Sequence, residues 1–514
     1  MERKFYFISI IHVILLGGLS IASYAQNNYW TQQYSSYTAL MGGTGMSNSD
    51  DNSVFYYNPG AIGFIDTMSI NVSANVYAYD RVTLKNGAGD GLDLISNKLN
   101  AHAQVLAGNL YFKKAPRFKF IYGYLLRNFN RLDFEQDTEK TGNFIPAAPG
   151  SEFFRGIFDF SFSNSEYWGG VGFGYKINDH ISVGLGHYGA YSNTKNLNYQ
   201  DLSVDATNPD GVPYVASIRQ RFKYNLNHFN ILFKPGIDFR WKKHKLGIAS
   251  MLPSIRIYGQ GRVYRSVETG NLHYYLVDSS ALFSSSPNLV VIGDQRRVRT
   301  TMKQAASISA GYEYKAKNWK VSCMVEYFFP MKEYDLIYSD EPVYARPEDA
   351  YAQQPILDFL RVKTGSFGVL NFGIGLDKKI GRKMSLLTGF RTDFNNKVPL
   401  FKEKYEDYIT SVNPQFWHFL HYSIGISIQN ENRRTYIGLL YKYGFSNYNK
   451  NFANMGNPSS DNLFLGTNNN NMSVNIHGIG FTIGYSIYSR VDKMFKPFPN
   501  TKKKKSKTKV TIPL

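Results

Sequence analysis

The feature that most restricts the fold of this chain is a long series of alternating segments. From residue 67 onward, apolar and polar side chains alternate along about fourteen stretches, each bounded by residues that favour turns. Successive side chains of a β-strand point to opposite faces, so the alternation predicts strands with two unlike faces. The expected strands are roughly 67–79, 104–113, 118–135, 165–177, 180–193, 222–241, 244–266, 303–316, 318–332, 365–378, 383–395, 416–430, 433–447 and 472–489.

The connections between these strands alternate in length. Short links near 113–118, 177–180, 241–245, 315–319, 378–383 and 430–434 separate long ones near 80–103, 135–164, 194–221, 267–302, 332–364, 396–415 and 448–471. Outer-membrane barrels show this pattern, with short periplasmic turns, long extracellular loops and an even strand number. A soluble sandwich gives no reason for it. We therefore predict an all-β fold, a transmembrane antiparallel β-barrel over residues 67–489, with the long loops forming a vestibule.

The two faces of the expected strands differ as a barrel requires. In the last strand, Ile479, Phe481, Ile483, Tyr485 and Ile487 alternate with glycine, threonine and serine. One face suits lipid and the other suits a crowded interior. Aromatic residues make up 16% of the chain and it has 44 glycines, a composition that fits aromatic girdles and a lumen of small residues.

The two ends of the chain differ from the barrel. Residues 1–25 resemble a secretory signal, with basic Arg3 and Lys4, an apolar run, and small residues before Ala25, after which we expect cleavage. The apolar run is too short for a spanning helix. Residues 490–514 are rich in lysine and proline and have no periodicity, which predicts a disordered periplasmic tail. An alternative is that this tail attracts anionic lipid or a periplasmic partner.

Residues 26–66 form a turn-rich segment that is unlike the strands. Gly42, Gly43 and Gly45 allow positive φ, and Pro59 disfavours helix at Asn58. The apolar side chains between Ala39 and Ile65 need a surface on which to pack. We therefore expect this segment to fold inside the barrel as a hatch.

The same segment carries a family resemblance. The run Met-Gly-Gly-Thr-Gly from Met41, a stretch rich in Asp and Asn, an aromatic pair and Asn-Pro-Gly-Ala from Asn58 follow one another. This order resembles the N-terminal hatch of the long-chain fatty acid outer-membrane transporter family (FadL/TodX type). Gly60 stands where that family has alanine. The resemblance implies a ligand near Asn58, Pro59 and Gly60, and it makes Phe55, Tyr56 and Tyr57 further candidates, with packing of the hatch core as the alternative.

The charges of the chain suggest other candidates. The net charge of +19 is spread over short turns and the tail, which argues against a nucleic-acid face. Alternation places several charged residues inside the barrel, and of these Arg391 and Lys442 are the candidates for binding a ligand carboxylate. The alternative is a ladder of salt bridges that only braces the barrel. The charged residues expected to face inward are Lys234, Asp238, Arg240, Glu326, Arg391, Asp393 and Lys442.

Signs of catalysis and metal binding are scarce. The sequence contains no Gly-x-Ser-x-Gly elbow, His-Glu-x-x-His motif, Walker loop or calcium loop, and Cys323 is its one cysteine. Gly169 to Gly174 alternate along a strand and are interpreted as small residues facing the lumen. Asp50, Asp51 and Asn52 could bind a cation, but a capping turn is the simpler interpretation. We expect no enzyme activity, no cofactor and no metal.

These features together predict a channel in the bacterial cell outer membrane. It would take up hydrophobic compounds, such as long-chain fatty acids or similar lipophiles, by passive diffusion. The resemblance implies loop capture, a pocket against the hatch, a hatch rearrangement and release through the wall. Expected partners are outer-membrane lipid, lipopolysaccharide and the hydrophobic ligand, with no nucleic acid, and the family suggests a monomer. The alternative is an outer-membrane interaction scaffold or secretion accessory; a barrel hydrolase is the weakest hypothesis.

Overall fold

The computed structural model describes most of the chain between Asn28 and Arg490. The described residues are 28–46, 51–112, 114–145, 148–207, 211–271, 288–346, 355–356, 358–396, 417–447, 449–459, 466 and 471–490. The expected signal segment and the expected tail lie outside this part of the chain. Within it, no helix has the length and apolar character needed to cross a membrane.

One antiparallel sheet closes on itself, because β1 pairs with β19 as well as with β2. Several labelled strands are consecutive pieces of one wall strand: β7 with β8, β9 with β10, β11 with β12, and β14 with β15. Counted in this way, the barrel has 14 strands, each paired with its neighbours in sequence, which confirms the predicted fold class. The strands are β1 (Thr67–Lys85), β2 (Leu94–Tyr111), β3 (Phe118–Gly142), β4 (Glu152–Lys176), β5 (Ile181–Thr207), β6 (Pro213–Trp241), β7 (His244–Met251), β8 (Ile255–Gly270), β9 (Leu289–Thr300), β10 (Ser307–Lys315), β11 (Trp319–Phe328), β12 (Met331–Tyr338), the two-residue β13 (Ala345–Arg346), β14 (Val362–Ser366), β15 (Val369–Lys379), β16 (Met384–Asp393), β17 (His418–Gln429), β18 (Arg433–Phe445) and β19 (Ser473–Arg490).

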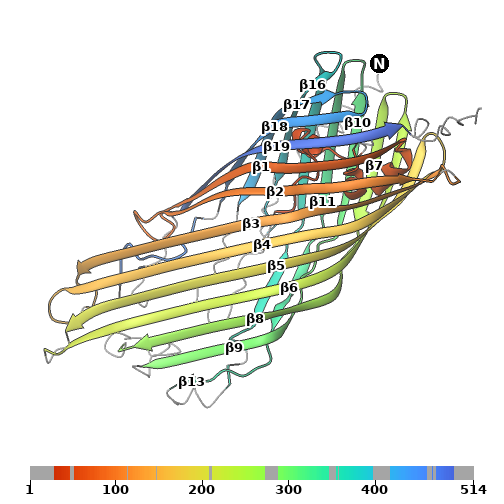
Figure 1. Cartoon of the computed structure of the whole chain (residues 1–514). Helices are drawn as coiled ribbons and strands as arrows, with labels where there is room; N and C mark the ends of the chain where they lie inside the picture. Colours follow the sequence, from red (N-terminus) through yellow and green to blue (C-terminus); the bar gives the residue numbers. More distant parts are fainter. Residues whose placement is uncertain are drawn as a thin grey trace, which may run out of the picture.

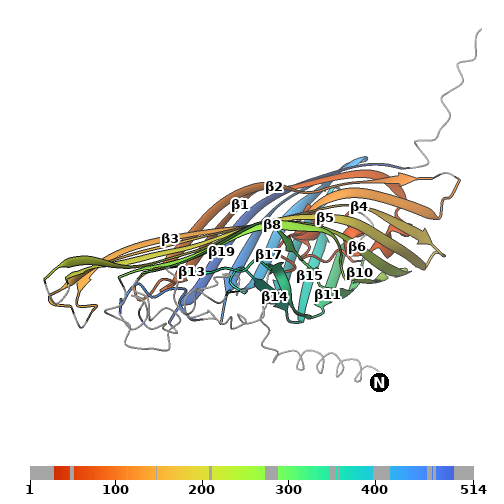
Figure 2. The ribbon, with the colours of Figure 1, turned by 90° about the horizontal axis from the view of Figure 1, so that it is seen from below.

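Four neighbouring strands are much longer than a membrane requires. β3, β4, β5 and β6 contain 25, 25, 27 and 29 residues. Together with β8 and β9 they extend beyond the barrel as a sheet that we call the blade (Figures 1 and 2). The long loops predicted near 135–164 and 194–221 are therefore wrong, since most of these residues are strand.

The blade is strand because its inner face has a core of its own. Phe134, Phe154, Phe158 and Phe160 alternate inward and are buried together with Met455, which belongs to the segment that follows β18. These side chains give the extended strands apolar area to bury above the membrane, at roughly 25 cal/mol per Å².

Two rings of exposed aromatic side chains mark the membrane-facing band. The ring beside the short turns contains Phe112, Tyr175, Trp241 and Trp319. The opposite ring contains Tyr77, Tyr79, Tyr124, Tyr191, Phe229, Tyr258, Tyr327, Tyr422 and Tyr441. Isoleucine, leucine and valine are exposed between the rings, as expected for a surface that faces lipid.

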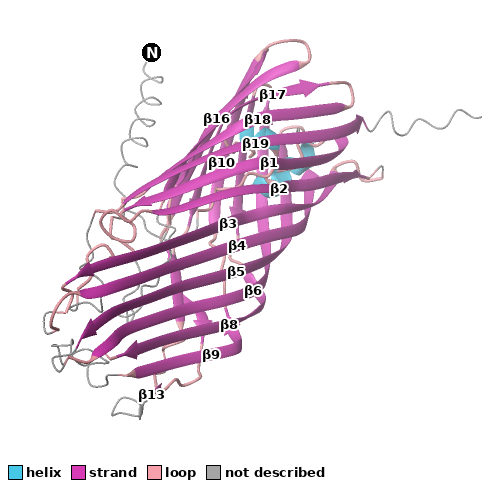
Figure 3. Cartoon of the chain, turned by 60° about the vertical axis from the view of Figure 1, so that its left-hand side comes forward, coloured by secondary structure: helices cyan, strands magenta, loops and turns pink. Residues whose placement is uncertain are grey.

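The N-terminal segment folds inside the barrel, where Figure 3 shows its helices enclosed by the wall. Its elements are α2 (Ser36–Leu40), α3 (Val54–Tyr57) and the 3-10 helix η1 (Pro59–Phe64), and every residue of these helices is buried. We call residues 28–46 and 51–65 the hatch. Gly42 and Gly43 adopt φ of 63° and 79°, as their sequence context predicts.

Glycines of the wall allow the hatch backbone to approach it closely. A Cβ atom on Gly184 would collide with the carbonyl of Pro59, and one on Gly389 would collide with the backbone of Gly42. In β4, Gly172 and Gly174 face Ile62 in the same way. Gly172 and Gly174 are thus a docking surface for the hatch, which agrees with their interpretation as small residues facing the lumen, whereas Gly169 is exposed on the outer face, so its interpretation as a lumen residue was wrong.

Candidate functional site

Three adjacent strands are irregular at one level of the wall. β1 has a register shift between Asn75 and Tyr77, Gln104 of β2 has no partner in β1, and Arg127 of β3 has none in β4. Each bulge reverses which residues face inward, because one extra residue shifts the alternation of inward and outward side chains by one position. In β3 the buried residue Ile121 has an odd number below the bulge, whereas the buried residues Leu132 and Phe134 above it have even numbers.

Above these bulges the wall separates between β2 and β3. The two strands pair only from Val105 with Leu125 to Tyr111 with Lys119. Beyond this point β2 continues to pair with β1 as far as Leu94, and β3 continues to pair with β4 as far as Gly142. We call the unpaired line between β2 and β3 the seam, and it starts at the level of the aromatic ring that contains Tyr124.

Side chains close the seam where backbone pairing is missing. Lys98 forms a salt bridge with Asp133, and the Ser96 hydroxyl oxygen accepts a hydrogen bond from the backbone nitrogen of Asp133 at 3.1 Å. The rings of His102 and Phe129 lie 5.5 Å apart across the same line. Contacts of this kind break at a smaller cost than a ladder of backbone hydrogen bonds, which makes the seam a weak line of the described wall.

A central cavity lies above the hatch. Its floor includes Tyr29 and Arg127, and Glu166 lies at its side. The full lining is Asn28, Tyr29, Arg127, Asn128, Phe162, Asn164, Glu166, Thr194, Tyr224, Leu226, Met302, Lys303, Gln304, Met331, Tyr334, Leu336 and Gly365. Aromatic and aliphatic side chains are mixed with amides and charges, so the cavity can take a molecule with both an apolar body and a polar group.

A second cavity, the side cavity, lies behind the seam. Its lining is Asn28, Thr31, Gln32, Asp80, Val82, Ser96, Lys98, Asn100, Asn128, Phe129, Asn130, Arg131, Leu132, Trp417, Phe419, Lys442 and Ile476. Asn28 and Asn128 line both cavities, so the two spaces adjoin at these residues. Asn128 directly follows the bulge residue Arg127. The cavities therefore follow one another from the lumen to the seam.

The start of the hatch is tied to the wall between the two cavities. Asp393 accepts hydrogen bonds from the backbone nitrogen of Trp30 and the hydroxyl of Thr31, both at 2.8 Å. Arg391 donates to the carbonyls of the same two residues at 3.2 Å. Arg127 donates to the carbonyl of Tyr29 at 2.7 Å. A segment held by these contacts can leave the wall only when several buried hydrogen bonds break together.

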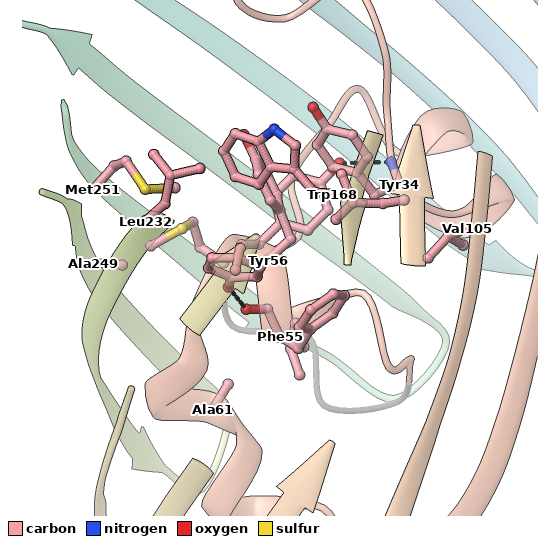
Figure 4. Packing of buried hydrophobic residues seen from close by; sticks show 14 of the residues in the cluster. Tyr34, Phe55, Tyr56, Ala61, Val105, Trp168, Leu232, Ala249 and Met251 are labelled. Carbon is pink, nitrogen blue, oxygen red and sulfur yellow. Dashed lines mark hydrogen bonds between the residues drawn. The ribbon is translucent and has the colours of Figure 1, made fainter. Parts of the chain in front are cut away.

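Beneath the central cavity an aromatic cluster joins the hatch to the barrel (Figure 4). The ring of Tyr56 lies 4.1 Å from that of Tyr34 and 5.7 Å from that of Trp168. The Lys234 ammonium group lies 4.6 Å from the centre of the Tyr56 ring, and the structure shows no hydrogen-bond partner for it among the described residues. The Trp168 indole nitrogen donates to Glu166 at 2.6 Å. The floor of the cavity is thus aromatic, with charged groups at its edge.

Asn58, Pro59 and Gly60 lie on the other side of the hatch, against β5 and β6. The Asn58 amide oxygen accepts a hydrogen bond from Gly60 at 3.0 Å, and its amide nitrogen donates to the carbonyl of Ile237 at 3.1 Å. None of the three residues lines either cavity. Phe55 packs on Tyr188, and the Tyr57 hydroxyl donates to Gln33 at 2.6 Å. Of the predicted hatch residues, Tyr56 is the one that contacts Arg127 and Trp168 beside the central cavity.

The two predicted cations occupy different positions. Arg391 is buried and directed at the hatch carbonyls, whereas Lys442 lines the side cavity and pairs with Asp80 at 2.8 Å. All the charged residues expected inside the barrel do face inward. Lys234, Asp238, Glu326, Arg391 and Asp393 are buried, and the partly buried Arg240 pairs with Asp238 at 2.7 Å.

Below α2 the lumen is closed by charged side chains. Lys320 lies 4.8 Å and Arg434 5.6 Å from the centre of the Tyr37 ring. Glu313 pairs with Lys245 at 2.7 Å at the same end. A straight path along the barrel axis would have to displace both α2 and these charged side chains, whereas the path to the seam passes the start of the hatch at Asn28 and the side chains that close the seam.

Burial changes the acidity of several hatch side chains. It raises the pKa of the Asp51 carboxyl group, whose carboxylate oxygen accepts a hydrogen bond from the backbone nitrogen of Ser53 at 2.7 Å. Burial also raises the pKa values of Tyr56 and Tyr57, so both phenols stay neutral. Asp51 thus takes part in a capping turn, and no group of three metal-ligating side chains occurs among the described residues. Asp50 lies outside the described residues.

Sequence reasoning missed the residues that lie between the cavities. Arg127 and Asn128 were not among the candidates, because a strict period of two assigns the wrong face to residues after a bulge; Glu166, on the regular strand β4, follows the alternation and was overlooked. The Leu125–Leu126 pair before Arg127 breaks the alternation and is the signal that could have located the bulge.

No protein-family model and no curated protein sequence matches the chain. Solved structures do. A FadL homologue of Pseudomonas aeruginosa is 12% identical with a TM-score of 0.51, covering 91% of this chain and 99% of its own. The toluene transporter TodX of P. putida is 12% identical with a TM-score of 0.55, covering 89% and 99%. A TodX variant described as a monoaromatic hydrocarbon channel is 12% identical with a TM-score of 0.53. The chain therefore has the fold of the FadL and TodX type of transporter.

Proposed function

We propose that this protein is an outer-membrane channel that passes hydrophobic compounds by diffusion from the central cavity to the seam. The observation that carries the proposal is that the two cavities adjoin at Asn28 and Asn128, and that the side cavity lies directly behind the line where β2 and β3 are unpaired. The similarity of the fold to a toluene transporter and a monoaromatic hydrocarbon channel supports this function over an enzymatic one.

The ligands we propose are long-chain fatty acids or similar lipophiles, small aromatic compounds included. Tyr29, Tyr224 and Tyr334 offer flat apolar surfaces in the central cavity, and Lys303 and Arg127 offer positive charge. A fatty acid would use both kinds of group, because a carboxylate needs a cation or several donors when it leaves water. A neutral aromatic compound would use only the rings. TodX is described as a toluene transporter, and this supports including the second class.

In this proposal the predicted site residues of the hatch and the wall have three tasks. Asn58, Pro59 and Gly60 would hold the lower hatch to β5 and β6, and Arg391 would hold its start to β16 as a positioning residue. Tyr56 would couple ligand binding in the central cavity to movement of the hatch, because it lies between the cavity residue Arg127 and the buried Lys234. Lys442 would line the exit route in the side cavity.

Asn128, one of the two residues shared by the cavities, gives the test. Asn128→Trp would fill the junction, and Asn193→Trp on the outer face of β5 is the matched control. With purified full-length protein in liposomes, we expect Asn128→Trp to abolish facilitated entry of radiolabelled oleate and toluene, and the control to behave as wild type. No facilitated entry of either compound by wild type would contradict the proposal and favour the alternative of an interaction scaffold.

We also propose that the protein resides in the outer membrane as a monomer. Among the described residues, the closed barrel leaves no unpaired strand edge for a second copy within the membrane-facing band, because β1 pairs with both β19 and β2.

A further inference from the structure

Exposed cations gather on the outer face of the blade, in the strands that follow one another as β5, β6, β8 and β9. We call this set the basic patch, and it consists of Lys195, Arg219, Arg221, Lys223, Arg262, Arg296, Arg297 and Arg299. Register places Lys223 beside Leu197 and Tyr264, and Arg262 beside Arg296. Neighbouring strands are about 4.8 Å apart, so the positive charges are concentrated.

The basic patch directly follows the aromatic ring of the membrane band. Tyr191, Phe229 and Tyr258 are neighbours in register and are exposed. Two residues further outward come the amides Asn193, Asn227 and Gln260, and beyond them the cations. The Asn193 amide donates to Asn227 at 2.7 Å. The order of aromatic, amide and cation means that the patch begins at the level of lipid headgroups and extends outward from it, because aromatic rings mark the interface.

Most of the patch has no carboxylate partner. Arg219 pairs with Asp201 at 2.9 Å, and Arg262 pairs with Asp294 at 2.5 Å. Lys195, Arg221, Lys223, Arg296, Arg297 and Arg299 form no ion pair with any residue that the structure describes. The same strands also carry Asp201, Asp205, Glu268 and Asp294, so the eight cations of the patch exceed these four carboxylates by four, whereas the nearby β3 exposes Glu135, Asp137 and Glu139. The positive charge is therefore a local property of this face.

A bulge adds to the density of arginine. The register between β8 and β9 shifts at Arg262, which leaves Arg297 unpaired with a φ of 57°. Arg296 and Arg297 are both exposed, although consecutive residues of a regular strand face opposite sides. A positive φ is costly for an arginine, and such strain persists where the surrounding structure or a function maintains it.

We propose that the basic patch binds the phosphate groups of lipopolysaccharide in the outer leaflet. Phosphates match the patch in charge, and arginine binds them through two parallel hydrogen bonds. The patch is also continuous with the lipid-facing band, so its occupant must be a molecule of the same leaflet. This binding would fix the height and tilt of the blade. It goes beyond transport but rests on the proposed location in the outer membrane.

The test compares binding of diphosphorylated lipid A to full-length protein variants in detergent, measured by native mass spectrometry. Lys195→Gln with Arg221→Gln and Lys223→Gln removes three unpaired cations. Lys378→Gln with Lys379→Gln and Lys383→Gln removes three exposed cations from the turn at the other end of the barrel. Each cation near an anionic lipid surface is worth about fivefold in affinity, so we expect a roughly hundredfold loss for the first variant alone.

Three further comparisons make the result decisive. Lipid A without phosphates should bind wild type as weakly as diphosphorylated lipid A binds the patch variant. The charge-preserving variant Lys195→Arg with Arg221→Lys and Lys223→Arg should keep most of the affinity. Binding of oleate should be unchanged in the patch variant, which separates this inference from the transport proposal. Equal binding by the patch variant and wild type, or an equal loss in the control variant, would overturn the inference.

Discussion

Trp30 and Asp393 are 363 positions apart in the chain, and the backbone nitrogen of Trp30 donates a 2.8 Å hydrogen bond to the Asp393 carboxylate. The Trp30 indole nitrogen donates to Glu326 at 2.7 Å, so one residue of the hatch is tied to two different wall strands. These contacts hold the start of the hatch beside Asn28, where the two cavities meet.

Replacing Asp393 should release this part of the hatch. Asp393→Ala leaves the Trp30 nitrogen and the Thr31 hydroxyl without an acceptor, which costs about 1–3 kcal/mol for each buried group. We expect faster hydrogen exchange in residues 28–33 and larger single-channel conductance. Asp294→Ala, which removes a carboxylate from the outer surface, is the control. Unchanged exchange in the Asp393 variant would show that the tie does not hold the hatch.

The glycines of β4 allow a sharper comparison within one strand. A Cβ on Gly174 would collide with the backbone of Gly63 and with Ile62, whereas a Cβ on Gly169 would meet nothing within 4 Å. We expect Gly174→Ala to destabilise hatch docking by about 1–3 kcal/mol, the usual cost of overpacking. Gly169→Ala should have no such effect. Limited proteolysis of the hatch measures the difference, and equal protease resistance would contradict close packing at Gly174.

Hatch docking should also depend on pH through Asp51. Burial raises its pKa in the folded hatch above the ordinary value of 3.8, so folding favours the protonated form. The stabilisation is complete below that ordinary value and is lost as pH rises through the raised folded value. We expect Asp51→Asn to keep the acceptor for Ser53 and to remove this loss. Hydrogen exchange of residues 51–65 at pH 4 and pH 7 tests it, with exposed Asp66→Asn as control. A wild-type hatch that is more stable at pH 7 would contradict the sign.

Lys303 offers a way to distinguish the two ligand classes. Its ammonium group is exposed in the central cavity and lies 4.5 Å from the Tyr334 ring centre. Lys303→Gln should weaken oleate binding about fivefold, since an exposed ion pair is worth up to about 1 kcal/mol. Toluene binding should not change. Quenching of tryptophan fluorescence can follow both ligands, and a loss shared equally by both would show that Lys303 acts through the shape of the cavity.

The sequence allowed prediction of the barrel more fully than of the route through it. Alternation gave every wall strand, because lipid and lumen impose a period of two on each crossing. The residues Gly42, Gly43 and Asn58 gave the hatch its turns, as expected from their backbone preferences. The seam could not be predicted, since it depends on bulges at Gln104 and Arg127 that align only in the folded sheet. The blade was missed because its outward residues are polar and resemble a loop when the inward phenylalanines are ignored.

The most direct test of lateral passage is to close the seam. Lys98→Cys with Asp133→Cys, in a Cys323→Ser background, places one thiol on each side of it for a short bis-maleimide cross-linker. Ser165→Cys with Asn193→Cys spans paired strands and is the control. We expect cross-linking across the seam to stop oleate and toluene passage into liposomes while binding to the protein persists, and the control cross-link to have no effect. Undiminished passage through a fully cross-linked seam would contradict a lateral route.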